Sequence, residues 1–233
     1  MTLVSRVLGL VRDIVLARWF GANAGMDAFF VAFKIPNFMR RLFAEGAFSQ
    51  AFVPVLTEYR TQREHGEVQA LVDQVAGTLI GLVGLLVLVG VLASPALVLL
   101  FAPGFWSDPV KFDLTAYMLR FTCPYLLFMA LVAFAAGVLN GYGRFGAAAF
   151  TPVWLNVVLI GAAVIVSPQL AQPELALAGG VLVAGVVQVL FLLPSLKRIG
   201  LFPRPQWGVR DAGVRRIMKL MLPGIIGSSV AQI

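Results

Sequence analysis

The sequence has little charge, almost no cysteine and almost no histidine. Only 12% of its 233 residues are Asp, Glu, Lys or Arg, about half the share found in a typical soluble domain. The single cysteine, Cys123, rules out an internal disulfide, and the single histidine, His65, leaves little material for acid–base chemistry or a metal cluster. We therefore expect no enzymatic activity, no metal site and no cofactor, with Cys123 buried as a small apolar residue and His65 solvated.

The basic residues are not arranged for binding nucleic acid. The net charge is +7, but the chain has no continuous stretch rich in Lys and Arg and no aromatic residues interleaved with one. Most basic residues lie beside long apolar runs, which is typical of membrane topology. We expect no nucleic-acid partner, and we interpret the 60% of hydrophobic residues as a surface that faces membrane lipids.

Four long runs, at 74–107, 121–143, 145–173 and 175–196, contain no Asp, Glu, Lys or Arg. A membrane-spanning helix needs about 20 apolar residues, so each run is long enough for one span. The first run is longer than one span requires, and Pro95 and Pro103 are expected to end or kink its helix. The aromatic residues Phe101, Phe105 and Trp106 near its end fit the membrane–water interface.

Two further helices are expected in the first 56 residues, and another at the end of the chain. Segments 3–20 and 27–56 are apolar but carry charges, and the turn-like segment 21–26 joins them as a hairpin. They could lie on the membrane surface as amphipathic helices, but apolar residues wrap most of each helix, which favours spanning. A last apolar segment starts near residue 212 and reaches Ile233 without a cap or polar tail, which indicates a longer protein.

The predicted fold is thus an all-α, polytopic transmembrane helix bundle. Residues 1–210 form its main domain, the linker 197–211 follows the sixth helix, and residues 212–233 begin a seventh. The six expected spans lie at about 3–20, 27–56, 74–94, 114–140, 147–167 and 175–196.

Loop charges predict the orientation of this bundle. With alternating loops, one side receives only Lys111, whereas the other receives Arg60, Arg63, Arg144, Lys197, Arg198, Arg204, Arg210, Arg215 and Arg216. Basic loops are enriched on the cytoplasmic side, so the N-terminus and the linker 197–211 are expected in the cytoplasm. In this linker, Trp207 is expected to rest at the lipid headgroups.

The second predicted helix carries a polar stripe. At about 100° per residue, four of its charged residues fall within about 40° of one another, and Asn37 lies on the adjoining flank. Phe29, Phe33 and Phe43 occupy the opposite flank, and Arg40 points elsewhere. The four residues of the stripe are Asp27, Lys34, Arg41 and Glu45.

Two interpretations of these charges compete. In the first, ion pairs hold the helices together, such as Arg41 with Glu45, or Arg6 with Asp13 or Asp27. In the second, a hydrated cavity binds an anion, for which guanidinium groups suit phosphate. Basic residues outnumber acidic ones in the first 56 residues, which favours the anion site. The basic residues are Arg6, Arg12, Arg18, Lys34, Arg40 and Arg41, and the acidic ones are Asp13, Asp27 and Glu45.

These strings resemble a known family. SRVLGLVRDIVLARWFG at 5–21 and DAFFVAFKIPNFMRRLFAEGAFSQAFVPVL at 27–56 are similar to the N-terminal signature of the MurJ/MviN lipid II flippases. APGF at 102–105, FTCPY at 121–125 and LKRIG at 196–200 also fit. The family belongs to the multidrug/oligosaccharidyl-lipid/polysaccharide (MOP) exporter superfamily. The resemblance implies that this chain is the N-terminal lobe of a fourteen-helix, two-lobed transporter, followed by the start of its seventh helix.

The resemblance also implies a function. Lipid II, the undecaprenyl-pyrophosphate-linked peptidoglycan precursor, would cross the bacterial inner membrane by alternating access between the two lobes. Membrane lipids and cell-wall synthesis proteins are the further expected partners. Three rival functions are an exporter of another polyprenyl-linked saccharide or of drugs, a non-transporting cell-wall scaffold, and a membrane enzyme acting on pyrophosphate lipids. The enzyme would need a carboxylate cluster, which the scattered acidic residues do not provide.

The family's cavity positions map onto the charged hairpin. The essential arginines correspond to Arg6, Arg12 and Arg40, which are expected to bind the pyrophosphate. Asp27 and Asn37 match further substrate-binding positions. The expected supporting residues of the cavity or gate are Asp13, Lys34, Arg41 and Glu45.

Overall fold

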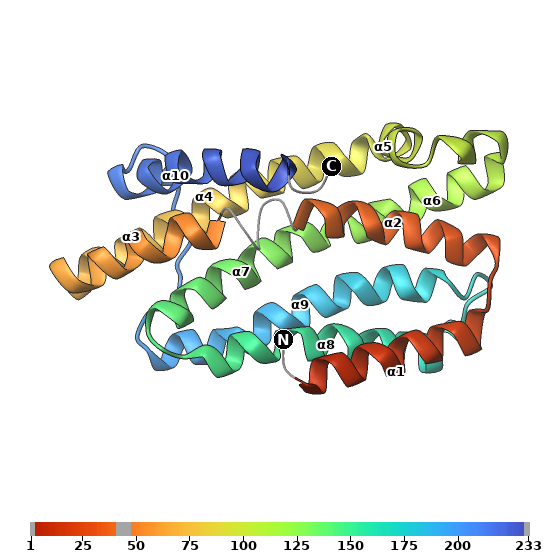
Figure 1. Cartoon of the computed structure of the whole chain (residues 1–233), viewed down its shortest axis with the longest axis horizontal. Helices are drawn as coiled ribbons and strands as arrows, with labels where there is room; N and C mark the ends of the chain where they lie inside the picture. The colour runs from red at the N-terminus through yellow and green to blue at the C-terminus, as the bar shows by residue number, and fades with distance from the viewer. Residues whose placement is uncertain (1–2, 41–47, 231–233) are drawn as a thin grey trace. The chain divides into compact units, whose positions relative to one another are not determined.

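The computed structural model describes residues 3–40 and 48–230, and every regular element within these ranges is helical (Figure 1). The predicted all-α fold is therefore confirmed. The helices are α1 (Leu3–Phe20), α2 (Ala24–Arg40), α3 (Phe48–Gln62), α4 (His65–Leu92), α5 (Ser94–Phe101), α6 (Pro109–Thr122), α7 (Tyr125–Gly141), α8 (Phe145–Gly161), α9 (Leu175–Arg198) and α10 (Ala212–Val230). Short 3-10 turns cover Pro103–Ser107 and Ser167–Gln169, and a π-helical turn covers Ala162–Val166.

Within the described ranges, four helical segments are long and apolar enough to cross a membrane. They are His65–Leu92, Pro109–Gly141, Phe145–Gln169 and Leu175–Arg198, and each contains most of one of the four uncharged runs. The spans expected from α1, α2 and α10 stay predictions. The 18 residues of α1 include Arg6, Arg12, Asp13 and Arg18, so this helix is far more polar than the other four segments.

Several helix boundaries differ from the prediction. The span expected at 74–94 is part of α4, which begins at His65, because hydropathy marks the part of a helix that faces lipid and not the polar turns before it. The helix expected at 114–140 is interrupted between Thr122 and Tyr125, where Pro124 cannot donate a backbone hydrogen bond. The expected helix 27–56 corresponds to α2 and α3, and residues 41–47 lie outside the described residues.

The chain divides into two compact units. The first contains Met1–Phe38, Leu86–Leu126 and Ala149–Gln188, and the second contains Met39–Leu85, Leu127–Ala148 and Val189–Ile233. Helices α2, α4, α7, α8 and α9 contribute residues to both units. The expected basic loops all belong to the second unit, whereas Lys111 belongs to the first.

The first unit has an aromatic core around α2. Phe29 is fully buried and stacks on Phe33 with ring centroids 5.8 Å apart, and Phe33 packs in turn on Tyr125. Thr122 of α6 donates to the carbonyl oxygen of Ala32 over 2.7 Å. Cys123 is buried and unbridged, as predicted. These contacts place the aromatic flank of α2 inside the unit and leave its charged stripe outside.

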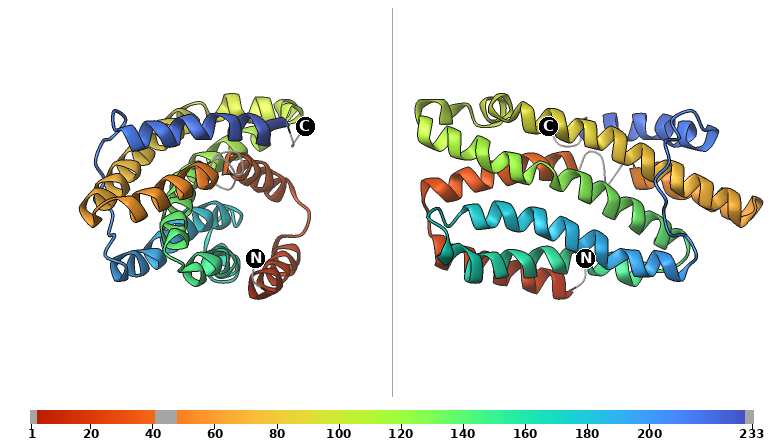
Figure 2. Two further views of the ribbon diagram at one scale, coloured as in Figure 1. Left: turned by 60° about the vertical axis from the view of Figure 1, so that its left-hand side comes forward. Right: turned by 180° about the vertical axis from the view of Figure 1, so that it is seen from behind.

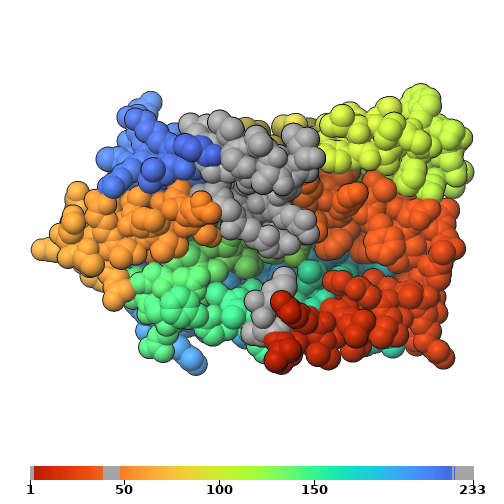
Figure 3. Space-filling model, viewed as in Figure 1, coloured from red at the N-terminus to blue at the C-terminus, as the bar shows by residue number. Residues whose placement is uncertain are grey.

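The core of the second unit joins α3, α4, α7 and α9. Phe52 is completely buried and lies against Phe48 and Phe134. Helix α10 packs beside α3 (Figure 3), where Arg216 forms an ion pair with Glu58 at 2.8 Å. His65, the first residue of α4, is exposed, as predicted.

Candidate functional site

Arg12 links α1 to α8, which run side by side (Figure 2). Its Nη1 donates to Oδ1 of Asn156 over 3.1 Å, and its Nη2 forms an ion pair with Asp13 at 2.7 Å. Asn156 is only 5% exposed. A guanidinium held from two directions has little freedom to turn, so the contacts fix the position of Arg12 on the face of α1.

Asn156 uses its whole amide group in this arrangement. While Oδ1 accepts from Arg12, Nδ2 donates to the carbonyl oxygens of Ser5 and Pro152 over 3.3 Å and 3.2 Å. Sequence reasoning did not single out this residue. The sequence did contain a signal for it, since Asn156 is an amide side chain inside an uncharged run. Polar groups at membrane depth are costly and often functional.

Among the described side chains, Asp27 pairs with a lysine and not with an arginine of the hairpin. Its Oδ2 accepts from Nζ of Lys111 over 2.6 Å. The same Nζ lies 4.3 Å from the centroid of the Phe105 ring, and the Lys111 side chain is only 18% exposed. Lys111, the single basic residue that the loop charges place on the non-cytoplasmic side, thus neutralises Asp27 at the start of α2.

The turn between α1 and α2 is anchored to the loop before α9. Gly21 has φ +64°, a left-handed conformation that glycine adopts readily. Asn23 caps α2 by accepting from the backbone N–H of Met26 over 2.7 Å. Its Nδ2 also donates to Oε1 of Glu174 over 3.0 Å. The hairpin turn therefore has a fixed place within the first unit.

The two faces of α2 agree with the predicted stripe. Asp27 and Lys34 are exposed, whereas Phe29 is buried. Asn37 is half-buried on the flank. Arg40 is the last described residue of α2, and its side chain, like Arg41 and Glu45, lies outside what the structure describes. The predicted Arg41–Glu45 pair therefore stays a prediction.

The hairpin cations exceed the acids available to them. Asp13 pairs with Arg12 and Asp27 with Lys111, so neither of the predicted Arg6 pairs forms. Arg6, Arg18 and Lys34 are exposed, and none of them has an ion-pair partner among the described residues. The described part of the hairpin therefore carries three basic groups that can engage an anion from outside.

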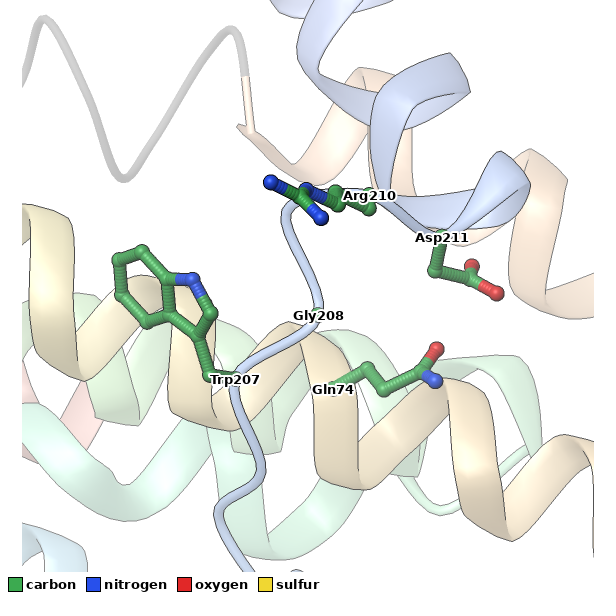
Figure 4. Close-up of a pocket in the computed structure, with 5 residues that line it drawn as sticks. All are labelled: Gln74, Trp207, Gly208, Arg210 and Asp211. Atoms are coloured by element: carbon green, nitrogen blue, oxygen red, sulfur yellow. The ribbon is translucent and has the colours of Figure 1, made fainter.

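The second unit contains a separate pocket of about 460 Å³ (Figure 4). It lies where the linker between α9 and α10 crosses α4. The residues that line it are Gln74, Trp207, Gly208, Arg210 and Asp211. Trp207 and Arg210 were expected to lie at the headgroups, but the contribution of Gln74 and Asp211 to a shared pocket was not foreseen.

Ion pairs on the second unit shift three pKa values. The hydrogen bond between Arg216 and Glu58 lowers the pKa of Glu58 below its ordinary value of 4.5 and raises the pKa of Arg216. The hydrogen bond to Glu67 raises the pKa of Arg63. Arg63 and Arg216 are exposed and Glu58 is half-buried, so both pairs lie at the surface of the unit.

Comparison with known proteins places the whole chain in one family. The family model described as "Lipid II flippase MurJ" matches residues 16–233. The "Probable lipid II flippase MurJ" of Vibrio cholerae is 50% identical over 240 residues, covering 100% of this chain and 46% of the relative. The "Lipid II flippase MurJ" of Burkholderia cenocepacia is 46% identical, with 100% and 46% covered.

A solved structure gives the same answer for the fold. "Lipid II flippase MurJ, inward closed conformation" matches with a TM-score of 0.80 and 26% sequence identity, covering 98% of this chain and 46% of that chain. The chain thus spans about half the length of the curated relatives and of the solved structure that it matches.

Proposed function

This chain belongs to the lipid II flippase MurJ family, and we propose that it forms the N-terminal lobe of a flippase that moves lipid II across the bacterial inner membrane. Its fold, a multi-pass bundle of membrane helices, supports this assignment. Lipid II has a pyrophosphate between its polyprenyl tail and its saccharide–peptide headgroup. A lobe that carries it must offer cations to the pyrophosphate and leave the apolar tail in lipid.

The surplus of cations in the hairpin is the observation that carries the proposal. Both described acids of α1 and α2 are already neutralised, by Arg12 and Lys111. Arg6, Arg18 and Lys34 are left for an external anion. Inserting a charged group to membrane depth costs about 2.5–3.5 kcal/mol on insertion scales. Because packing does not offset this cost for an unpaired cation, we attribute these cations to binding of an anionic ligand.

Each residue has a distinct part in the proposed site. Arg12 is held by Asp13 and Asn156, and it offers its remaining N–H groups to the pyrophosphate. Arg6 and Arg40 add further guanidinium groups, whose fork matches phosphate oxygens. Asp27 and Asn37 are the further proposed substrate-binding positions. The proposed supporting residues of the cavity or its gate are Asp13, Lys34, Arg41 and Glu45.

Transport then follows from movement of two lobes around the bound headgroup. Alternating access exposes a site near the membrane midplane first to one side and then to the other. The pyrophosphate crosses while bound to the arginines, and no covalent bond is made or broken. The basic loops of the second unit face the cytoplasm in this proposal, as does the N-terminus. Cell-wall synthesis proteins are the proposed partners.

The test places this chain in a complete transporter. Residues 1–233 replace the matching half of the Vibrio cholerae relative, in cells depleted of their own flippase, and lipid II exposed on the outer leaflet is measured. We expect the chimera to restore exposure and Arg12→Ala to lower it at least about tenfold, since hydrogen bonds to charged groups contribute about 1.5–3 kcal/mol. Arg63→Ala, which removes an exposed arginine of a loop pair, is the matched control.

Two outcomes would reject the proposal. One is normal lipid II exposure in the Arg12→Ala chimera at equal protein level. The other is a chimera that exports a polyprenyl-linked saccharide without a peptide stem in preference to lipid II, which would assign the chain to another exporter of the superfamily.

A further inference from the structure

The linker between α9 and α10 is fixed to α4 through its backbone. The buried carboxylate of Asp73 accepts from the backbone N–H of Arg204 over 2.7 Å. The carbonyl oxygen of Asp73 accepts from the N–H of Gln206 over 2.9 Å, and the hydroxyl of Thr78 accepts from the N–H of Gly208 over 3.3 Å. Three of the linker's backbone donors therefore bind one helix.

Two glycines of α4 give the linker room to lie this close. A Cβ atom at Gly77 would collide with the backbone of Gln206, and one at Gly81 would collide with the ring of Trp207. The two glycines are four residues apart and so lie on one face of the helix. Because neither glycine has a side chain, the linker backbone and the Trp207 ring can lie directly on this face of α4, which we call the glycine track.

The Trp207 ring lies where the surface of α4 changes from polar to apolar. Asp73 and Gln74 precede Gly81, whereas Leu82 and Leu85, which follow it, are 42% and 59% exposed. Because α4 is long and apolar enough to span a membrane, these exposed leucines face lipid. Trp207 is itself 66% exposed. An exposed indole at such a boundary is typical of the headgroup layer.

The pocket beside this ring has an available cation but no available anion. Asp211 caps α10 by accepting from the N–H groups of Gly213 and Val214 over 2.8 Å and 3.1 Å. The Gln74 amide, with its nitrogen turned toward Asp211, donates to Oδ2 over 3.2 Å. Arg210 is exposed and has no ion-pair partner among the described residues.

The side chains divide across the linker. The Trp207 ring and the Arg210 guanidinium lie on one side of it, and Gln74 and Asp211 lie on the other (Figure 4). The acid is thus turned away from the cation and occupied elsewhere. An apolar ring at the lipid boundary and an unpaired guanidinium together match the two parts of a phospholipid, its glycerol–acyl region and its phosphate.

We propose that this pocket binds the phosphate of an anionic phospholipid with a single phosphodiester, such as phosphatidylglycerol. Arg210 pairs with the phosphate, and the Trp207 ring packs on the glycerol backbone. The pocket is lined by one arginine, which matches one phosphate charge better than the higher charge of a pyrophosphate. The bound lipid holds the linker at headgroup level. This site is independent of the hairpin and of the cargo that the protein moves.

The test measures lipid binding by native mass spectrometry of the purified full-length protein, titrated with phosphatidylglycerol in a zwitterionic detergent. We expect Arg210→Gln to weaken the tightest binding step about fivefold, as one basic residue near an anionic surface contributes about 1 kcal/mol. Trp207→Leu should weaken it as well. The matched control is Arg204→Gln, an exposed arginine of the same linker that does not line the pocket.

Three results would overturn the proposal. Equal losses in Arg210→Gln and Arg204→Gln would indicate general attraction to a basic surface. Displacement of phosphatidylglycerol by millimolar inorganic phosphate would assign the pocket to a free anion. Stronger, Arg210-dependent binding of undecaprenyl pyrophosphate than of phosphatidylglycerol would assign it to the transported class of lipid.

Discussion

The two units use buried polar groups in opposite ways. In the second unit, Oδ1 of Asp73 accepts from the backbone N–H of Arg204 and from the amide of Gln69, so its charge fixes one segment of the chain on another. In the first unit, Asn156 holds a charged side chain, Arg12, on the surface of α1. The polar group of Asp73 thus stabilises the fold, whereas that of Asn156 positions a charged side chain toward a ligand.

The distinction depends on what remains unpaired after folding. A buried carboxylate that accepts from the protein's own N–H groups stabilises the structure. In the hairpin, the acids are neutralised while Arg6, Arg18 and Lys34 are not. Four predictions sharpen the comparison of the two units, from the largest expected effect to the smallest.

The first substitution places a second acid beside Arg12. This arginine already pairs with Asp13, and Asn156→Asp would add a carboxylate about where Oδ1 now accepts from Arg12 at 3.1 Å. Two carboxylates on one arginine would leave a net negative charge that repels the pyrophosphate. We expect lipid II exposure by the full-length chimera to fall roughly tenfold or more, equivalent to at least about 1.4 kcal/mol. Asn140→Asp, the same change at an exposed position of α7, should leave exposure unchanged. Equal activity of both variants would mean that the charge of Arg12 is not used.

The second substitution removes the acid that organises the linker. Asp73→Ala leaves the Arg204 N–H without its acceptor, and an unsatisfied buried donor costs about 1–3 kcal/mol. We expect the free energy of unfolding in mixed micelles to fall by about 2 kcal/mol. The control is Asp113→Ala, which removes an exposed carboxylate from α6. If the two variants were equally stable, the contrast between the units would be lost.

The third substitution tests the glycine track on α4. Gly77→Ala would drive a methyl group into the backbone of Gln206, and overpacking of this kind costs about 1–3 kcal/mol. Gly84→Ala meets no atom within 4 Å, and it should be neutral or stabilising by up to about 1 kcal/mol because alanine favours helix. Proteolysis of the linker measures the difference: it should be faster only in Gly77→Ala.

The fourth prediction concerns pH and has the smallest effect. The pKa of Glu58 is lowered by its hydrogen bond from Arg216, so the pair stabilises the fold above the ordinary pKa of 4.5. This contribution is lost as the pH falls through the lowered value. Carboxyl chemical shifts of Glu58 measured against pH should show the lowered pKa in the wild type and a return toward 4.5 in Arg216→Ala. An unchanged titration would contradict the pair.

The sequence predicted the parts of the fold that depend on local composition. Uncharged runs located the four most apolar spans, and Pro95 marked the start of a new helix after α4. The helical period separated Asp27 and Lys34 from Phe29, and the structure keeps them on different faces. These features follow from the transfer of side chains to lipid and from helix geometry.

The features that the sequence did not predict depend on contacts between segments far apart in the chain. The partner of Asp27 is Lys111, 84 residues away, and the partner of Arg12 is Asn156, 144 residues away. Neither spacing leaves a periodic signal. The same holds for Gly77 and Gly81, which look like ordinary glycines of a membrane helix until the linker is seen lying on them.

The clamped linker has a mechanical consequence. Helix α10 begins at Ala212, only four residues after Gly208, whose N–H is bound to Thr78 of α4. A segment this short can extend very little further. A shift of α10 by more than a few ångströms must therefore pull α4 with it or break the bonds to Asp73 and Thr78. The linker therefore couples the positions of α4 and α10 rigidly.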